Sequence, residues 1–128
     1  GWPSVWQFYI YWLQKSNRMI FDKEGTTTIV FQEKTSLSTF MENLNNAYPK
    51  IKHDNIIINL FSFKKLTEAD ILEFLDISNT HKESGQSFVL VTDKVAYDEV
   101  PDEISVVPTI QEAKDLIEME EIERDLGI

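Results

Sequence analysis

The spacing of hydrophobic positions changes several times along the chain, and each change predicts a new element of structure. Residues 19–33 hold two runs rich in Thr, Val, Ile and Phe around Gly25, which predicts a β-hairpin. Ser36 then precedes apolar positions at helical spacing, which predicts a capped helix ending near Tyr48-Pro49. The apolar set of this helix is Leu37, Phe40, Met41 and Leu44.

The most hydrophobic run of the chain covers residues 55–61, NIIINLF. It is too continuous for a half-exposed strand, so we predict a central strand covered on both faces. After two lysines, Thr67 and Asp70 are spaced almost as a capping box and head a second helix. The buried stripe predicted for that helix is Ile71, Leu72, Phe74, Leu75 and Ile77.

The second half of the chain repeats the alternation of strand and helix. Residues 88–91 predict another buried strand, 94–103 a polar connection without a period, and 104–108 a short edge strand. Thr109 and Glu112 are spaced as a second capping box before the last helix. That helix should turn inward Ile110, Ala113, Leu116, Ile117 and Ile122. The pattern predicts an α/β domain with a mixed sheet of about four to five strands and three main helices.

The first 18 residues, GWPSVWQFYIYWLQKSNR, differ from the rest because they contain all three tryptophans. Their polar residues fall at Ser4, Gln7, Tyr11 and Gln14, which would form one narrow stripe on an otherwise apolar helix. We therefore expect residues 1–18 to be an aromatic N-terminal extension, upstream of a domain at 19–128. Such a helix should dock on its own domain or on a second copy, giving a homodimer through residues 2–13. Membrane binding is the weaker alternative.

The amino-acid composition of the chain argues against several classes of function. A net charge of −10 argues against nucleic acid as a partner, and the absence of cysteine fits a cytoplasmic protein and excludes thiolate chemistry. The two histidines, His53 and His81, lack metal-binding spacing, and we expect both to be solvated at the ends of elements. No nucleotide loop or hydrolase motif is present. We therefore predict no enzyme activity, no cofactor, no metal and no membrane association.

Acidic residues are concentrated at the end of the chain. Residues 98–128 contain eleven acids and two bases, a net charge of −9. Runs of this kind on a loop and a terminal helix are usually solvated surfaces. The functional alternatives are a surface for a basic partner and weak calcium binding, although the spacing typical of a calcium loop is absent.

The order of elements and three short motifs resemble the STAS domain, the fold of anti-sigma-factor antagonists. The motifs are Asn59-Leu60 at the end of the central strand, the helix start at 67–70, and PTIQEA at 108–113. The resemblance covers residues 19–122 in layout and implies a non-catalytic regulatory or adaptor domain that binds another protein. It implies a kinase-like regulator as the partner, whereas the acidic run at 98–128 indicates a partner with a basic surface.

In switch-type STAS domains a serine at this helix start accepts phosphate, and that position falls on Glu68 or Ala69 here. Neither side chain can be phosphorylated. Thr67 is either a structural cap or a modified residue, and Glu68 is either a permanent substitute for phosphate or an ordinary acid at a helix start. The candidate surface for a partner comprises Asn59, Ser62, Thr67, Glu68, Ala69 and Asp70.

Two other hypotheses remain at this point. A small-ligand or nucleotide-binding module could use the helix start at Thr67, as some relatives of the fold do. The chain is also similar to small Bacteroidetes proteins labelled ribonuclease Z. That label implies an RNA-processing protein, but the two histidines of this chain do not supply a metal site.

Overall fold

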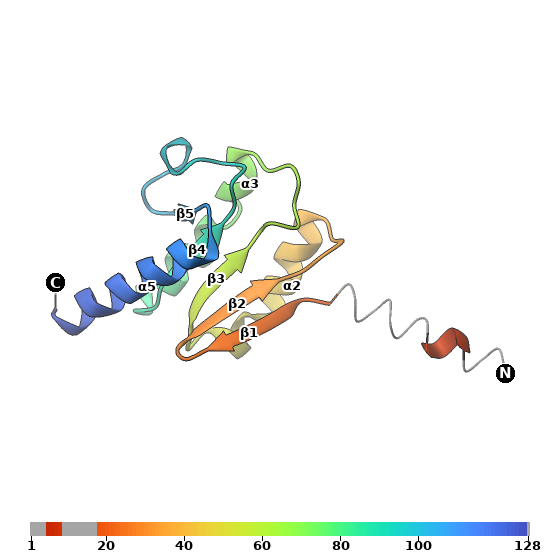
Figure 1. Cartoon of the computed structure of the whole chain (residues 1–128), viewed down its shortest axis with the longest axis horizontal. Helices are drawn as coiled ribbons and strands as arrows, with labels where there is room; N and C mark the ends of the chain where they lie inside the picture. The colour runs from red at the N-terminus through yellow and green to blue at the C-terminus, as the bar shows by residue number, and fades with distance from the viewer. Residues whose placement is uncertain (1–4, 9–17, 128) are drawn as a thin grey trace.

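The computed structural model describes residues 5–8 and 18–127 and shows one five-stranded sheet (Figure 1). The strands lie in sequence order: β1 (Ile20–Glu24), β2 (Thr27–Phe31), β3 (Asn55–Asn59), β4 (Phe88–Val91) and β5 (Ser105–Val107). β1 pairs antiparallel with β2, and the other pairs are parallel. The predicted hairpin, mixed sheet and edge strand at the end of the chain are therefore confirmed.

Helices cover both faces of the sheet (Figure 1). They are α2 (Leu37–Ile51), α3 (Glu68–Leu72), α4 (Leu75–Glu83) and α5 (Ile110–Asp125), with a short 3₁₀ turn η1 (Tyr97–Glu99). The larger core lies between the sheet and α2, α3 and α4, and the smaller core lies under α5. Each face of the sheet is thus buried by a different set of helices.

Strand β3 contributes buried side chains to both cores. Ile56, Ile57 and Ile58 are all fully buried. Because side chains alternate along a strand, Ile56 and Ile58 enter the larger core and Ile57 enters the smaller one. Burial of each such side chain stabilises the fold by about 1.5–3 kcal/mol. The prediction of a central strand covered on both faces is confirmed.

The first predicted helix runs further than expected. Ser36 caps α2, and its side chain accepts a hydrogen bond from the Thr39 amide at 3.2 Å. The predicted end near Tyr48-Pro49 is wrong, because the helix continues through Pro49 to Ile51. Ile51 is only 6% exposed, so burying this side chain favours one more turn, and the proline removes only one helical hydrogen bond.

The second predicted helix is divided into α3 and α4. The Phe74 amide donates to the Ile71 carbonyl at 3.0 Å, an i to i+3 bond that tightens the backbone between the two helices. Leu72 lies about 100° around α3 from the buried Ile71, and it is 42% exposed. Its predicted place in the buried stripe is wrong, whereas Ile71, Phe74 and Ile77 are buried as expected.

The burial of side chains in the last helix and in the connection at 94–103 also differs from the prediction. Ala113 and Ile117 are buried in α5, but Ile122 is 52% exposed because five residues turn a helix about 140° away from Ile117. The connection at 94–103, predicted as a polar segment, contributes side chains to the core. Val95 and Val100 are buried in it, and Ile104 follows them into the core.

Of the aromatic extension, the structure describes residues 5–8 and Arg18. Residues 5–8 are helical, and Val5, Trp6 and Phe8 in this stretch are exposed. The predicted apolar helix of this extension and the homodimer through residues 2–13 fall largely outside the described residues. Both stay predictions, as does the domain boundary after residue 18.

Candidate functional site

The candidate site lies where the parallel strands end. The carboxyl ends of β2, β3, β4 and β5 meet at one edge of the sheet, because these strands run in the same direction. The loop at 60–67, helix α3 and the loop at 92–104 gather above this edge, at the top of Figure 1. Open α/β sheets commonly bind their partners and ligands there.

Two of the predicted site residues hold the loop after β3. Asn59 Oδ1 accepts a hydrogen bond from the Phe61 amide at 3.0 Å, which turns the chain at the end of the strand. Ser62 Oγ donates to the Gln32 carbonyl at 2.7 Å, so it ties this loop to the end of β2. Asn59 and Ser62 therefore position the loop rather than offer free polar groups.

Thr67 and Asp70 form a complete capping box. The Asp70 amide donates to Thr67 Oγ1 at 3.3 Å, and the Thr67 amide donates to Asp70 Oδ2 at 3.0 Å. The structure thus confirms the cap predicted at this helix start. A cap of this kind contributes about 1 kcal/mol of stability.

Glu68 and Ala69 are, together with the capping residue Thr67, the exposed part of the predicted site. Both side chains lie in the first turn of α3 and face solvent. Within the described part of the chain, no side-chain hydrogen bond or ion pair engages the Glu68 carboxylate. The structure therefore brings the six predicted residues onto one continuous loop and helix start, of which Glu68 and Ala69 are the accessible centre.

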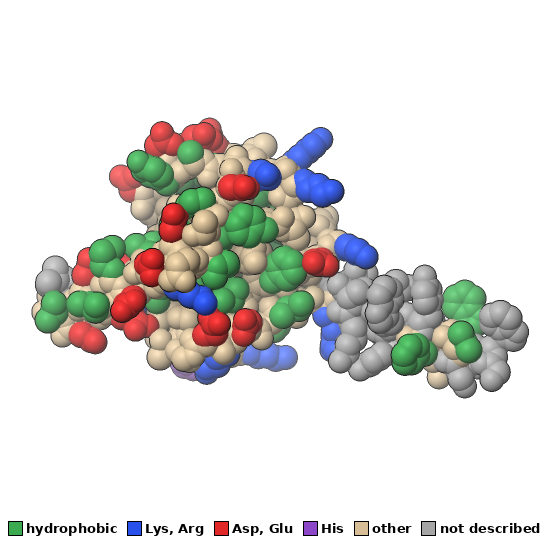
Figure 2. All heavy atoms as spheres, viewed as in Figure 1, with side chains coloured by type: hydrophobic (Ala, Val, Ile, Leu, Met, Phe, Trp, Pro, Cys, Tyr) green, Lys and Arg blue, Asp and Glu red, His purple; other side chains and the backbone are tan. Residues whose placement is uncertain are grey.

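Charges of opposite sign lie on either side of this edge. Lys64 and Lys65 are exposed on the loop before α3, and the loop at 92–104 carries exposed acids. Those acids are Asp93, Asp98, Glu99, Asp102 and Glu103. Figure 2 shows basic side chains on the right and acidic ones on the left of the upper end. A partner that binds here meets a polarised surface.

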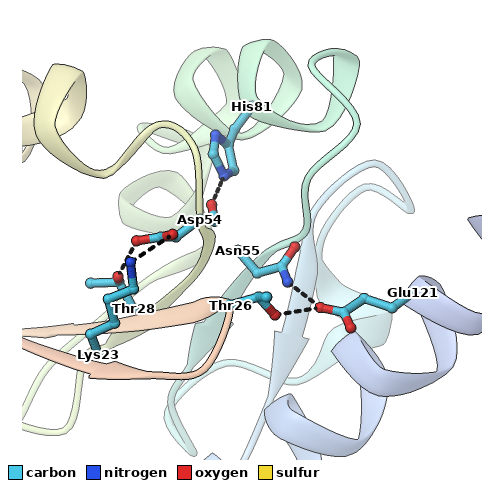
Figure 3. Close-up of polar contacts among 7 residues, drawn as sticks. All are labelled: Lys23, Thr26, Thr28, Asp54, Asn55, His81 and Glu121. Carbon is cyan, nitrogen blue, oxygen red and sulfur yellow. Dashed lines mark hydrogen bonds and ion pairs between the residues drawn. The ribbon is translucent and has the colours of Figure 1, made fainter.

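Residues missed by the sequence analysis form a polar network at the opposite edge (Figure 3). Asn55 is 1% exposed, and its Nδ2 donates to Glu121 Oε1 at 2.5 Å. Thr26 Oγ1 donates to the same oxygen at 2.9 Å, and the Ser87 amide donates to Asn55 Oδ1 at 2.9 Å. The view of Glu121 as part of a solvated acidic surface is wrong, because it fastens α5 to the strands.

His81 is also part of this edge, and its predicted solvation is wrong. The ring is fully buried, with Nε2 2.7 Å from the Asp54 carbonyl and Nδ1 2.8 Å from the Tyr48 hydroxyl. Because a carbonyl only accepts, Nε2 carries the proton and Nδ1 accepts from the tyrosine. Burial lowers the pKa of His81, opposed by its hydrogen bond to Asp54 and the charge of that residue. Its spacing from Ile77, four residues earlier, was the available signal.

His53 is exposed, as expected. Across residues 5–8 and 18–127, no three or more His, Cys, Asp or Glu side chains are grouped to hold a metal ion. None of the helices described is long and apolar enough to cross a membrane.

Of the comparisons with known proteins, the one with solved structures agrees with this architecture. No protein-family model and no curated protein sequence matches the chain. Among solved structures it is similar to a serine-to-glutamate variant of RsbS from Moorella thermoacetica, a STAS domain, at 17% identity. The match has a TM-score of 0.58 and covers 79% of this chain and 95% of the other. The chain therefore has a STAS-like α/β fold.

Proposed function

We propose that this chain is a non-catalytic regulatory or adaptor domain that binds another protein through the loop after β3 and the start of α3. One observation carries the proposal: the capping box engages Thr67 and Asp70, and Glu68 and Ala69 stand exposed between them. The STAS-like fold supports it, because such folds are usually non-catalytic regulators that bind proteins.

The same geometry supports a surface without a phosphorylation switch. The Thr67 hydroxyl already accepts a hydrogen bond from the Asp70 amide, so modification of this hydroxyl would remove a helix cap. Glu68 places a fixed negative charge in the first helical turn, where the helix dipole favours an anion. We propose that Glu68 acts as a permanent acidic contact for a basic group of the partner.

The nucleotide-binding alternative gains less support from this geometry. Helix α3 has five residues, and its first turn already contains Glu68 and Asp70. These two carboxylates would repel a phosphate at the same helix start. A thermal-shift panel of nucleotides should therefore leave the melting temperature unchanged, whereas a ligand at 100 times its Kd would add about 2.7 kcal/mol.

Capture of the partner tests the proposal directly. Purified wild-type protein and the Ala69→Arg variant should be immobilised in parallel, exposed to lysate of the native host, and compared by quantitative mass spectrometry. Ala69 is exposed, so the variant should fold normally but block the surface sterically. Lys52→Glu at the exposed end of α2 is the matched control.

The expected result is at least one protein that the wild type and the Lys52→Glu control retain and Ala69→Arg loses. Glu68→Lys should lose the same protein if the partner presents a basic group. Retention of every captured protein by Ala69→Arg would contradict the proposed surface.

A further inference from the structure

Helix α5 carries a second apolar stripe that its own domain does not cover. Its inner face packs Ala113 and Ile117 against the sheet. Met119, Ile122 and Leu126 are 52%, 52% and 68% exposed. Exposed apolar side chains are common singly, but three in one line, two in the last turns of α5 and one at its C-cap Leu126, form a surface.

The spacing of these residues places them on one line. Steps of three and four residues return to the same side of a helix, so Met119, Ile122 and Leu126 form a single stripe. That stripe lies opposite the side on which Ala113 and Ile117 meet the sheet. Figure 2 shows hydrophobic and acidic side chains next to each other over this end of α5, at the left of the molecule.

The three apolar positions match the seam of a coiled coil, with Met119 and Leu126 at a positions and Ile122 at d. The flanking e position is then Glu123, and the flanking g positions are Glu118 and Asp125. All three flanking residues are acidic and exposed. In paired helices the e and g positions decide which partner is accepted.

A second copy of this chain fits the stripe poorly. Pairing two α5 helices would bring acidic flanks together in either direction, and like charges in these positions are destabilising. An acidic surface also disfavours an anionic membrane. A helix with the same apolar seam and with Lys or Arg at its e and g positions would cover the apolar stripe and also pair with the acidic residues beside it.

We propose that the outer face of α5 is a docking surface for a basic amphipathic helix of another protein. Met119, Ile122 and Leu126 supply the apolar seam, and Glu118, Glu123 and Asp125 pair with the basic flanks of the partner. This surface is separate from Glu68 and Ala69 at the carboxyl edge of the sheet. The domain would then join two partners through two faces.

Fluorescence anisotropy with two synthetic peptides tests the proposal. The first is a labelled 21-residue helix with Leu at a and d and Lys at e and g; the second has Glu in place of each Lys. The full-length protein should bind the basic peptide at least tenfold more tightly than the acidic one. The double variant Met119→Ser/Ile122→Ser should bind the basic peptide at least tenfold more weakly than the wild type.

Matched variants separate docking from general attraction to an acidic protein. Ile20→Ser/Phe21→Ser removes two exposed apolar side chains of β1, away from both proposed surfaces, without a change in charge, and it should leave the affinity unchanged. The charge reversal Glu118→Lys/Glu123→Lys should lower affinity for the basic peptide and raise it for the acidic one. Circular dichroism should show the same fold in every variant.

Equal binding of the basic peptide by the wild type and Met119→Ser/Ile122→Ser would overturn the proposal, as would no binding at all. Sedimentation provides a further test. A dimer of the full chain that is lost in Met119→Ser/Ile122→Ser would show that a second copy covers this stripe, and would also overturn it.

Discussion

The two ends of strand β3 carry an asparagine each, and the structure uses them differently. At the amino end, Asn55 is 1% exposed and bonds to Glu121 and Ser87, which belong to other parts of the chain. At the carboxyl end, Asn59 bonds to the Phe61 amide, two residues away. The amino end is held by long-range buried contacts, whereas the carboxyl end is held mainly by local ones.

With the partner surface proposed above, this difference would separate stability from partner binding within one sheet. Buried polar groups are costly to leave without partners, so the network around Asn55 and His81 holds helices α4 and α5 in place. The bonds of Asn59, Thr67 and Asp70 shape a loop and a helix start at the surface. Residues at the amino end should therefore affect folding, and residues at the carboxyl end should affect binding.

The largest expected effect comes from Asn55→Ala. The change leaves the buried Ser87 amide without its acceptor and takes one of two donors from Glu121 Oε1, so it should lower the free energy of unfolding by about 3 kcal/mol. Asn59→Ala is the matched control and should cost about 1 kcal/mol. Urea denaturation of both proteins measures the comparison. Equal losses would remove the distinction between the two ends.

The next prediction concerns pH. Burial lowers the pKa of His81 below its ordinary value of 6.5, so the unfolded chain binds more protons below that pH. The contribution of the neutral ring is complete above pH 6.5 and is lost as pH falls through the lower pKa of the folded state. The free energy of unfolding, measured by urea at several pH values, should fall more steeply from pH 7 to 5 in the wild type than in His81→Leu. Parallel curves would contradict this.

A smaller effect is expected at the carboxyl end. Thr67→Ala removes the helix cap and should lower the free energy of unfolding by about 1 kcal/mol, while Thr67→Ser should retain most of it. Mass spectrometry after incubation with host lysate and ATP should find no phosphate on Thr67. Stoichiometric phosphothreonine would restore a switch at this end of the sheet.

The smallest effect on stability is expected from removal of residues 1–18. If the domain begins at Met19, the shortened protein should unfold cooperatively with a free energy within about 1 kcal/mol of the full chain. Its assembly should be smaller if the aromatic segment pairs two copies. Denaturation and sedimentation measure the two quantities. Failure of residues 19–128 to fold would place the extension in the core.

The order of strands and helices could be predicted because β3, β4 and the cap residues give strong local signals. Ile56, Ile57 and Ile58 form an uninterrupted apolar run, and Thr67 precedes Asp70 by the spacing of a capping box. The break between α3 and α4 gave no such signal. It depends on one tightened turn, in which the Phe74 amide donates to the Ile71 carbonyl.

The polar contacts were harder to predict because they join distant residues. Asn55 and Glu121 are 66 positions apart, so nothing in their local sequence indicates that they bond. The prediction of a solvated His81 rests on its place at the end of a helix, although its helical spacing from Ile77 places it inward. At the candidate site, the cap at Thr67 was predicted correctly, whereas the bond from Ser62 to Gln32 depends on the neighbouring strand.

The charged edge strand β1 affects how readily the protein can aggregate. It lies at the edge of the sheet, where one row of backbone groups could pair with a strand of another molecule. Three of its five residues, Asp22, Lys23 and Glu24, are charged, which hinders such pairing. The neighbouring strand β2, TTIVF, is uncharged and consists of β-branched and aromatic residues, which favour strand pairing. β1 therefore protects an aggregation-prone segment, and its detachment would expose that segment to other chains.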